Sequence, residues 1–261
     1  MSYFSETIAR IKQSLDVDGF YLYERFLQDS NFLDDLGDSL LRIYRATDGI
    51  ESTYYSGTVH FLLGRDPSFL ELLEDRRLHE IVYEIMGIDV RIHSYNGLVV
   101  EPGSSMVQQE IHRDGKVCSE CGRSKGFQIL IFLDDYTKEN GAIRLLKKND
   151  NYLRELNSDE FDKDSILIEG PSGSVLFFET GIWHASGQNL SATERKAITL
   201  VYFEKDVSPQ IDFSSALSDD LKDCLSKDVK DLIGLNTVVP KNIGEFYLNA
   251  MKNNLEAQDN G

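Results

Sequence analysis

The segment SGSVLFFETGIWHASGQNLSATERKAITLVYF, residues 172–203, carries the features that decide the fold. Apolar and polar residues alternate in it with the period of β-strands, and turn residues separate the runs. His184 is followed eleven positions later by Arg195. A second segment, QQEIHRDG at residues 108–115, adds His112 and Asp114. Together the two segments predict a metal site built on β-type sequence.

The three side chains His112, Asp114 and His184 suit one kind of metal site. In a β-strand alternate side chains share a face, so His112 and Asp114 are expected to project together and chelate one ion. Two imidazoles and one carboxylate form the facial triad that holds Fe(II) and leaves positions open for substrate and oxygen. Taken alone, either histidine also fits a surface position or a buried position in which its ring nitrogens are hydrogen-bonded.

Arg195 gives this site a second anchor. A fixed arginine at the base of a barrel can pair bidentately with a carboxylate. An iron site combined with such an arginine suits a dicarboxylate that chelates the metal through a keto acid, which describes 2-oxoglutarate. By itself Arg195 also fits a surface charge at a strand end, beside Glu194 and Lys196.

The order of these motifs resembles a known family. A histidine, a Ser-Gly pair, an asparagine, an arginine and a small residue follow one another at His184, Ser186, Gly187, Asn189, Arg195 and Ala197. Upstream lie His112-Arg113-Asp114-Gly115 and an Asn140-Gly141 turn. Over roughly residues 17–205 the chain resembles the phytanoyl-CoA dioxygenase (PhyH) family of Fe(II)/2-oxoglutarate-dependent oxygenases.

The resemblance implies a role for each residue. His112, Asp114 and His184 would be the catalytic metal ligands, and Arg195 would clamp 2-oxoglutarate with a hydrogen bond from Ser186. Tyr95, on the strand before the metal motif, is a further candidate for cosubstrate binding, with a core or turn role as its alternative. The implied enzyme uses O2, releases succinate and CO2, and hydroxylates an unactivated C–H bond of a small metabolite. Because Asp114 is present, hydroxylation is favoured over halogenation.

Two segments depart from the family pattern. Lys147-Lys148-Asn149-Asp150 stands where many members have Pro-Gly-Ser-His, and residues 116–123 resemble an insertion after the metal motif. That insertion contains Cys118 and Cys121, which fit two free thiols, half of a zinc site or a redox pair. The chain has three cysteines, which favours a reducing compartment and hence the cytoplasm.

Composition and charge limit the partners. The net charge is −17 and the isoelectric point about 4.7, so nucleic acid is not an expected partner. A coenzyme A ester is also disfavoured, unless Arg123, Lys125, Lys147 and Lys148 gather into a basic rim; a solvated surface is the alternative. No apolar run approaches the ~20 residues of a membrane span. We therefore expect a monomer or homodimer acting on a small molecule, and the acidic surface favours a polar or cationic one.

The chain is predicted to be mainly β with flanking helices around a double-stranded β-helix (jelly-roll or cupin-like) core. Its 261 residues suit a single oxygenase domain. Residues 1–88 show helical spacing and would buttress the barrel, and residues 89–205 contain seven or eight short strands. Residues 206–261 form an acidic helical segment that would pack on the barrel, cover the site or form a dimer surface.

Two other functions fit the same residues. One is a cupin-type metalloenzyme that does not use 2-oxoglutarate. The presence of Arg195 together with the triad argues against this alternative. The other is a non-catalytic metal-binding barrel that serves as a binding or regulatory module. An acyl-CoA, an amino acid, a natural-product intermediate and a sugar-linked metabolite all remain open as substrates.

Overall fold

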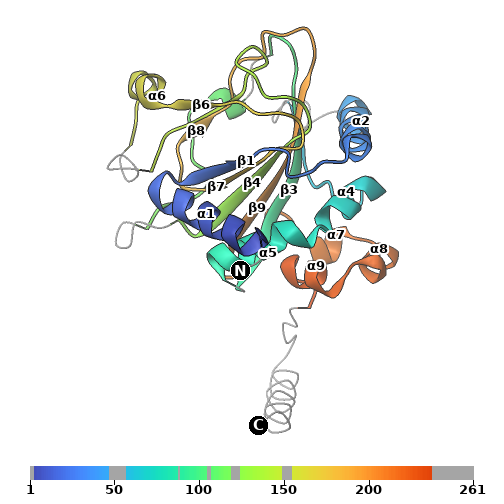
Figure 1. Ribbon diagram of the computed structural model, residues 1–261. Coiled ribbons are helices and arrows are strands. Elements are labelled where there is room, and N and C mark those ends of the chain that lie inside the picture. The colour runs from blue at the N-terminus through green and yellow to red at the C-terminus, as the bar shows by residue number, and fades with distance from the viewer. Residues whose placement is uncertain are drawn as a thin grey trace.

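A six-stranded antiparallel sheet forms the larger wall of the barrel, in the order β1-β7-β4-β9-β3-β2 (Figure 1). This computed structural model describes residues 3–46, 57–87, 89–104, 107–118, 124–148 and 155–236. The strands of the large sheet are β1 (Phe20–Tyr23), β2 (Thr58–Val59), β3 (Val90–Val100), β4 (Gly126–Phe132), β7 (Val175–Glu179) and β9 (Arg195–Glu204).

A smaller antiparallel sheet faces the first one, in the order β6-β5-β8. Its strands are β5 (Ile143–Leu145), β6 (Ile166–Ile168) and β8 (His184–Ala185). Two such sheets with flanking helices are the architecture of a double-stranded β-helix, so the predicted fold class is confirmed.

The helices lie mainly on the outer face of the large sheet. They are α1 (Tyr3–Val17), α2 (Ser30–Ala46), α4 (Pro67–Leu73), α5 (Arg76–Met86), α7 (Phe213–Ala216), α8 (Asp219–Cys224) and α9 (Lys227–Leu232). In Figure 1, α6 (Ser158–Asp164) lies apart from them, beside β6 and β8. Aspartate caps begin three of these helices: Asp66 accepts the N–H of Ser68, Asp75 that of Arg77, and Asp212 those of Ser214 and Ser215.

Strand alternation gives the large sheet two different faces. On β9, Leu200 and Tyr202 point outward into the core shared with the helices, where Leu36, Leu40 and Ile81 are also buried. Ala197 on the same strand points inward and packs in a separate core between the two sheets. The helices therefore pack against the outer face of the large sheet and leave its inner face free to form the site.

The described part of the C-terminal segment packs on the barrel. Phe213, Val229 and Leu232 are buried in the helix-side core, and α9 contacts β3. The acidic helices expected here are therefore present in residues 206–236, whereas residues 237–261 lie outside the described range. No helix in the described ranges is both long and apolar enough to cross a membrane.

Candidate metal centre and cosubstrate site

The three predicted metal ligands come together at the edge of the small sheet. One ligand atom from each of His112, Asp114 and His184 lies within 4.8 Å of the other two. The Nε2 atom of His184 is 3.3 Å from Asp114 Oδ2, and that of His112 is 3.6 Å from Asp114 Oδ1. Three donors converging from two chain segments form the arrangement that a facial triad requires.

The hydrogen bonds of both histidines leave the correct ring nitrogen for a metal. His112 Nδ1 lies 2.8 Å from the carbonyl oxygen of Glu110, and His184 Nδ1 lies 2.9 Å from that of Ile182. Because a carbonyl oxygen only accepts, Nδ1 carries the proton in each ring, and the Nε2 lone pair stays available to bind a metal. The donor set therefore fits a divalent transition metal.

The charges of the triad reinforce this fit. Burial lowers the pKa of His112, and the neighbouring His184 lowers it further. Burial acts to raise the pKa of Asp114, yet the two histidines and Gln128 bring it below its ordinary value. For His184 burial acts to lower the pKa, but the contact with Asp114 raises it. Asp114 is thus ionised at neutral pH, as a metal ligand must be.

The segment that carries His112 and Asp114 is not the regular strand that we predicted. Residues 107–109 form a 3-10 helix, and one isolated bridge follows, in which His112 and His184 exchange two backbone hydrogen bonds of 3.0 Å. Gly115 is then held by a 2.9 Å bond from its N–H to Thr180 O. A Cβ at position 115 would collide with the Thr180 side chain. Close backbone approach, rather than strand alternation, brings the ligands together.

Arg195 lies inside the barrel and not on its surface. Its side chain is on the inner face of β9, and the residue is only 3% exposed. Nη2 donates a 2.8 Å hydrogen bond to Ser186 Oγ, and Nη1 donates to the carbonyl oxygen of Gly141. The guanidinium also lies over the ring of Tyr136, 4.3 Å from its centroid. The interpretation of Arg195 as a strand-end surface charge is therefore wrong.

The charge of Arg195 has no carboxylate partner among the described residues. Arg195 Nε and the hydroxyl of Tyr136 are both buried, and neither has a hydrogen-bond partner in the described ranges. A buried cation without a counter-charge is costly, and a ligand carboxylate removes that cost. These two unpartnered groups are the observation that fits a carboxylate cosubstrate at this position.

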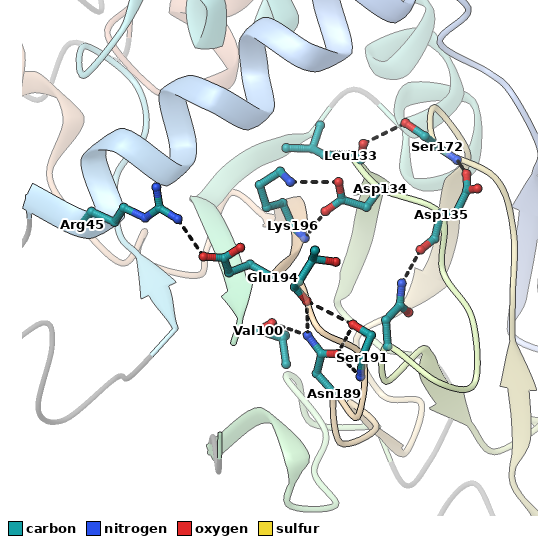
Figure 2. A network of polar contacts seen from close by, with 12 residues as sticks. Arg45, Val100, Leu133, Asp134, Asp135, Ser172, Asn189, Ser191, Glu194 and Lys196 are labelled. Carbon is teal, nitrogen blue, oxygen red and sulfur yellow. Dashed lines mark hydrogen bonds and ion pairs between the residues drawn. The ribbon is translucent and has the colours of Figure 1, made fainter. Parts of the chain in front are cut away.

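The neighbours of Arg195 hold the start of β9 in place (Figure 2). Glu194 forms an ion pair with Arg45 of α2, with 2.7 Å between the carboxylate oxygen and the guanidinium nitrogen. Lys196 donates twice to Asp134, from its backbone N–H at 2.6 Å and from Nζ at 2.8 Å. Both flanking charges are thus paired outside the barrel, which fixes the strand so that Arg195 points inward.

Asn189 organises the turn between β8 and β9, as Figure 2 also shows. Its side chain is completely buried. Nδ2 donates to the carbonyl oxygens of Val100 and Thr193, at 2.8 Å each. Oδ1 accepts from the N–H and hydroxyl of Ser191. The asparagine of the sequence motif therefore has a structural role close to Arg195.

A cavity of about 330 Å³ connects the metal ligands to Arg195 and Ser186. Four of the five histidines of the chain line it, since His60 and His93 join the two in the triad. Sequence reasoning missed several further lining residues, which are Thr58, Ser94, Gln108, Gln128, Tyr136, Thr199 and Gln210. Strand alternation counted from Arg195 marks Thr199 as inward-facing, but the sequence holds no comparable reference point for Gln108 or Gln210.

The structure does not bring Tyr95 to this cavity. Its side chain is buried in the helix-side core, and its hydroxyl donates a 2.8 Å hydrogen bond to Phe69 O. The next residue, Asn96, lines the cavity. Because neighbouring residues of a strand point to opposite faces, the proposed cosubstrate role of Tyr95 is corrected to a core role.

The structure also bears on the two departures from the family pattern. Lys125, Lys147 and Lys148 pair with Asp206, Asp18 and Glu179 respectively. Each of these three lysines therefore has an acidic neighbour that offsets its charge, and Arg123 lies outside the described residues. Cys118 is half-buried, whereas Cys121 lies outside the described residues, so the roles expected for the cysteine pair stay predictions.

Solved structures share this fold at low sequence identity. The non-heme α-ketoglutarate-dependent epimerase SnoN from nogalamycin biosynthesis matches with a TM-score of 0.61 and 14% identity, over 77% of this chain and 84% of that one. EvdMO1 also matches with a TM-score of 0.61, at 19% identity, over 76% of this chain and 50% of that one.

Sequence comparisons extend the likeness to curated proteins and to a family. The uncharacterized protein Rv1501 of Mycobacterium tuberculosis is 24% identical over 73% of this chain and 71% of its own length. Dioxygenase af480 of Aspergillus fumigatus is 20% identical over 69% of this chain and 59% of its own length. The model of the family Phytanoyl-CoA dioxygenase (PhyH) matches residues 15–197, a span that contains the triad and Arg195. The chain is therefore an enzyme that belongs to the phytanoyl-CoA dioxygenase family.

Proposed function

We propose that this enzyme is an Fe(II)- and 2-oxoglutarate-dependent dioxygenase that hydroxylates an unactivated C–H bond of a small metabolite, with release of succinate and CO2. The observation that carries the proposal is the buried guanidinium of Arg195, which has no carboxylate partner among the described residues and lies in the same cavity as His112, Asp114 and His184. A metal alone does not require that cation. The cation is required if a cosubstrate binds the metal at one end and carries a carboxylate at the other.

Each residue has a role in this proposal. His112, Asp114 and His184 would hold Fe(II), through Nε2 of each imidazole and one carboxylate oxygen. Arg195 would pair with the distal carboxylate of 2-oxoglutarate, while Ser186 keeps the guanidinium in place. When bound, the metal supplies the oxidising chemistry, in which decarboxylation of the cosubstrate by O2 is coupled to hydroxylation of the substrate.

The protein contributes orientation and exclusion of water. Apolar side chains line the cavity between its polar groups, and they include Leu98, Leu130 and Ile143. Such walls keep water away from the reacting carbon and strengthen the ion pair of Arg195, because the local dielectric constant is low. The chain thus places a target C–H bond near the metal and leaves the redox chemistry to the metal and oxygen.

An anaerobic titration tests the proposal. Protein loaded with Fe(II) is titrated with 2-oxoglutarate while the visible metal-to-ligand charge-transfer band is followed, in the wild type and in Arg195→Ala. We expect the band in the wild type and a need for at least tenfold more 2-oxoglutarate in the variant, because a charged hydrogen-bonded pair contributes roughly 1.5–3 kcal/mol.

Arg144→Ala is the matched control. Arg144 lies on β5 of the small sheet but pairs outward with Asp162 and does not line the cavity, so its loss should leave the titration unchanged. If iron binds and no band forms in the wild type, the proposal fails, and a metalloenzyme that does not use 2-oxoglutarate or a non-catalytic binding module takes its place.

A further inference from the structure

The cavity is lined by amides and hydroxyls and has few charges. Four carboxamide side chains face it from four segments: Asn96, Gln108, Gln128 and Gln210. Three hydroxyl side chains, Thr58, Ser94 and Thr199, lie among them. Apart from Asp114 and Arg195, no Asp, Glu, Lys or Arg of the described residues lines this cavity. Among the described lining residues, a charged substrate would therefore find no further carboxylate, lysine or arginine as a counter-charge once the metal and the cosubstrate are bound.

Two of the amides present unused acceptors. Gln108 donates through Nε2 to Thr58 Oγ1 at 2.5 Å, and Gln128 donates through Nε2 to Thr199 Oγ1 at 3.2 Å. The Oε1 atoms of both glutamines are buried and have no hydrogen-bond partner among the described residues. Gln128 as a whole is only 7% exposed. Buried acceptors of this kind favour a ligand that donates hydrogen bonds to them.

The other two amides present donors. Asn96 Nδ2 donates to Gln210 Oε1 at 3.1 Å, and Asn96 Oδ1 accepts from the N–H of Phe61 at 3.0 Å. The Gln210 backbone is held by a 2.8 Å bond from its N–H to His93 O. With both amide oxygens engaged, the N–H groups that remain on Asn96 and Gln210 can only donate. The cavity thus offers acceptors and donors together.

A hydroxyl group is both donor and acceptor, so it satisfies both kinds of amide. We propose that the substrate is an uncharged, polyhydroxylated small molecule whose hydroxyls donate to Gln108 and Gln128 and accept from Gln210. This inference rests on the proposed dioxygenase function. The cavity volume of about 330 Å³ lies at the lower end for small-molecule pockets. Because the metal and 2-oxoglutarate occupy part of it, the remaining space suits a substrate no larger than a single ring. The acidic surface suggested either a polar or a cationic substrate. Because Asp114 is the only carboxylate among the described lining residues, the cavity favours the polar one.

Three pyranoses of equal ring size and different charge test the proposal. Protein loaded with Zn(II), as a redox-inert substitute for iron, and saturated with 2-oxoglutarate is studied by ligand-observed saturation-transfer NMR. The probes are methyl glucopyranoside, glucosamine and glucuronate, with methyl galactopyranoside and myo-inositol as further neutral compounds. We expect at least one neutral probe to bind at least fivefold more tightly than both charged ones.

The outcomes separate this inference from the proposed function. If 2-oxoglutarate binds but glucosamine or glucuronate binds as well as the neutral probes, or if no neutral probe binds, the substrate inference is overturned and the dioxygenase proposal stands. If 2-oxoglutarate itself does not bind the metal-loaded protein, the dioxygenase proposal fails.

Variants of Gln108 locate the contact. Gln108→Met removes the acceptor and should weaken binding of the neutral probe at least fivefold, with 2-oxoglutarate binding unchanged. Gln109→Met is the matched control, because Gln109 lies on the same 3-10 helix but donates away from the cavity to Ser104 O. Gln108→Glu keeps an acceptor and adds a charge, so it should shift preference toward glucosamine. An unchanged probe preference in both Gln108 variants would contradict the assignment.

Discussion

Arg195 and Ser186 are joined by a 2.8 Å hydrogen bond from the guanidinium Nη2 to the hydroxyl Oγ, which connects β9 of the large sheet to the end of β8 in the small sheet. Ser186 directly follows β8, which carries His184, so the bond links the arginine to the strand that holds a metal ligand. In the proposed cosubstrate site, this one contact would thus partly set the distance between the metal end and the carboxylate end.

Ser186→Ala should therefore weaken 2-oxoglutarate binding without abolishing it. The variant keeps Arg195 and its charge but removes the hydroxyl that accepts from the guanidinium, and such a hydrogen bond contributes about 0.5–1.5 kcal/mol. We expect about a threefold to tenfold rise in the dissociation constant, measured by anaerobic titration of the Fe(II)-loaded protein. Ser208→Ala, at an exposed serine outside the cavity, should behave as the wild type. A loss as large as that of Arg195→Ala would show that Ser186 does more than position the guanidinium.

Divalent metal should stabilise the folded protein through the triad. Because the three ligands converge only in the native state, a metal binds the folded chain far better than the unfolded chain. At a Mn(II) concentration about 100 times its dissociation constant the gain is about 2.7 kcal/mol, or roughly 5–10 °C in the thermal midpoint. Asp114→Ala should abolish that rise, as measured by differential scanning calorimetry.

The control for this measurement is Asp206→Asn. Asp206 is also an acidic residue, but it pairs with Lys125 on the surface. The Mn(II)-dependent rise should survive in this variant. A rise of equal size in Asp114→Ala would place the metal somewhere other than the triad.

The sequence predicted the composition of the site better than its local geometry. The candidate metal ligands and Arg195, which the structure brings to one cavity, follow from residue type, order and spacing, because metal and carboxylate chemistry restrict the choice of side chain. The backbone around His112 does not follow, because one bridge to His184 and the close approach of Gly115 to Thr180 replace a regular strand. Contacts between segments that are distant in the sequence set that geometry, and a local sequence pattern does not predict such contacts.

Tyr95 and Asn96 show a second limit. They are adjacent on β3, so one faces the helices and the other the cavity, and a shift of one residue exchanges the two. The segment Val90–Val100 is almost continuously buried on both faces, and it contains a register shift between Ile92 and Ser94. Without a clear polar and apolar alternation, the sequence does not indicate which residue points inward. Gln210 could not be predicted either, because a loop after β9 brings it to the cavity.

Asn189→Ala should destabilise the fold as well as the site. The change removes the donor from two carbonyl oxygens, those of Val100 and Thr193, and leaves an empty volume at a completely buried position. Each unpaired buried group costs about 1–3 kcal/mol, so we expect a loss of about 2–4 kcal/mol in the free energy of unfolding, measured by urea denaturation. Gln188→Ala, at the exposed preceding residue, should change it by less than about 0.5 kcal/mol. Equal stability of the two variants would contradict the role given to Asn189.

His79 should make the fold sensitive to mild acid. The residue is 3% exposed, its Nε2 is hydrogen-bonded to Leu73 O, and its Nδ1 accepts from the hydroxyl of Tyr202 at 3.2 Å. Burial lowers the pKa of His79, so the unfolded chain takes up the proton more readily than the folded one. The stability from neutral His79 is therefore complete above the unfolded pKa of about 6.5 and is lost as the pH falls through that value toward the folded pKa.

Urea denaturation at pH 7.5, 6.5 and 5.5 measures this effect in the wild type and in His79→Gln. Within the window the free energy of unfolding of the wild type should fall by up to about 1.4 kcal/mol per pH unit from this residue. His79→Gln should be less stable at pH 7.5, because it loses the buried contacts, but its stability should fall less between pH 6.5 and 5.5. Parallel pH profiles for the wild type and His79→Gln would assign the acid sensitivity to other groups.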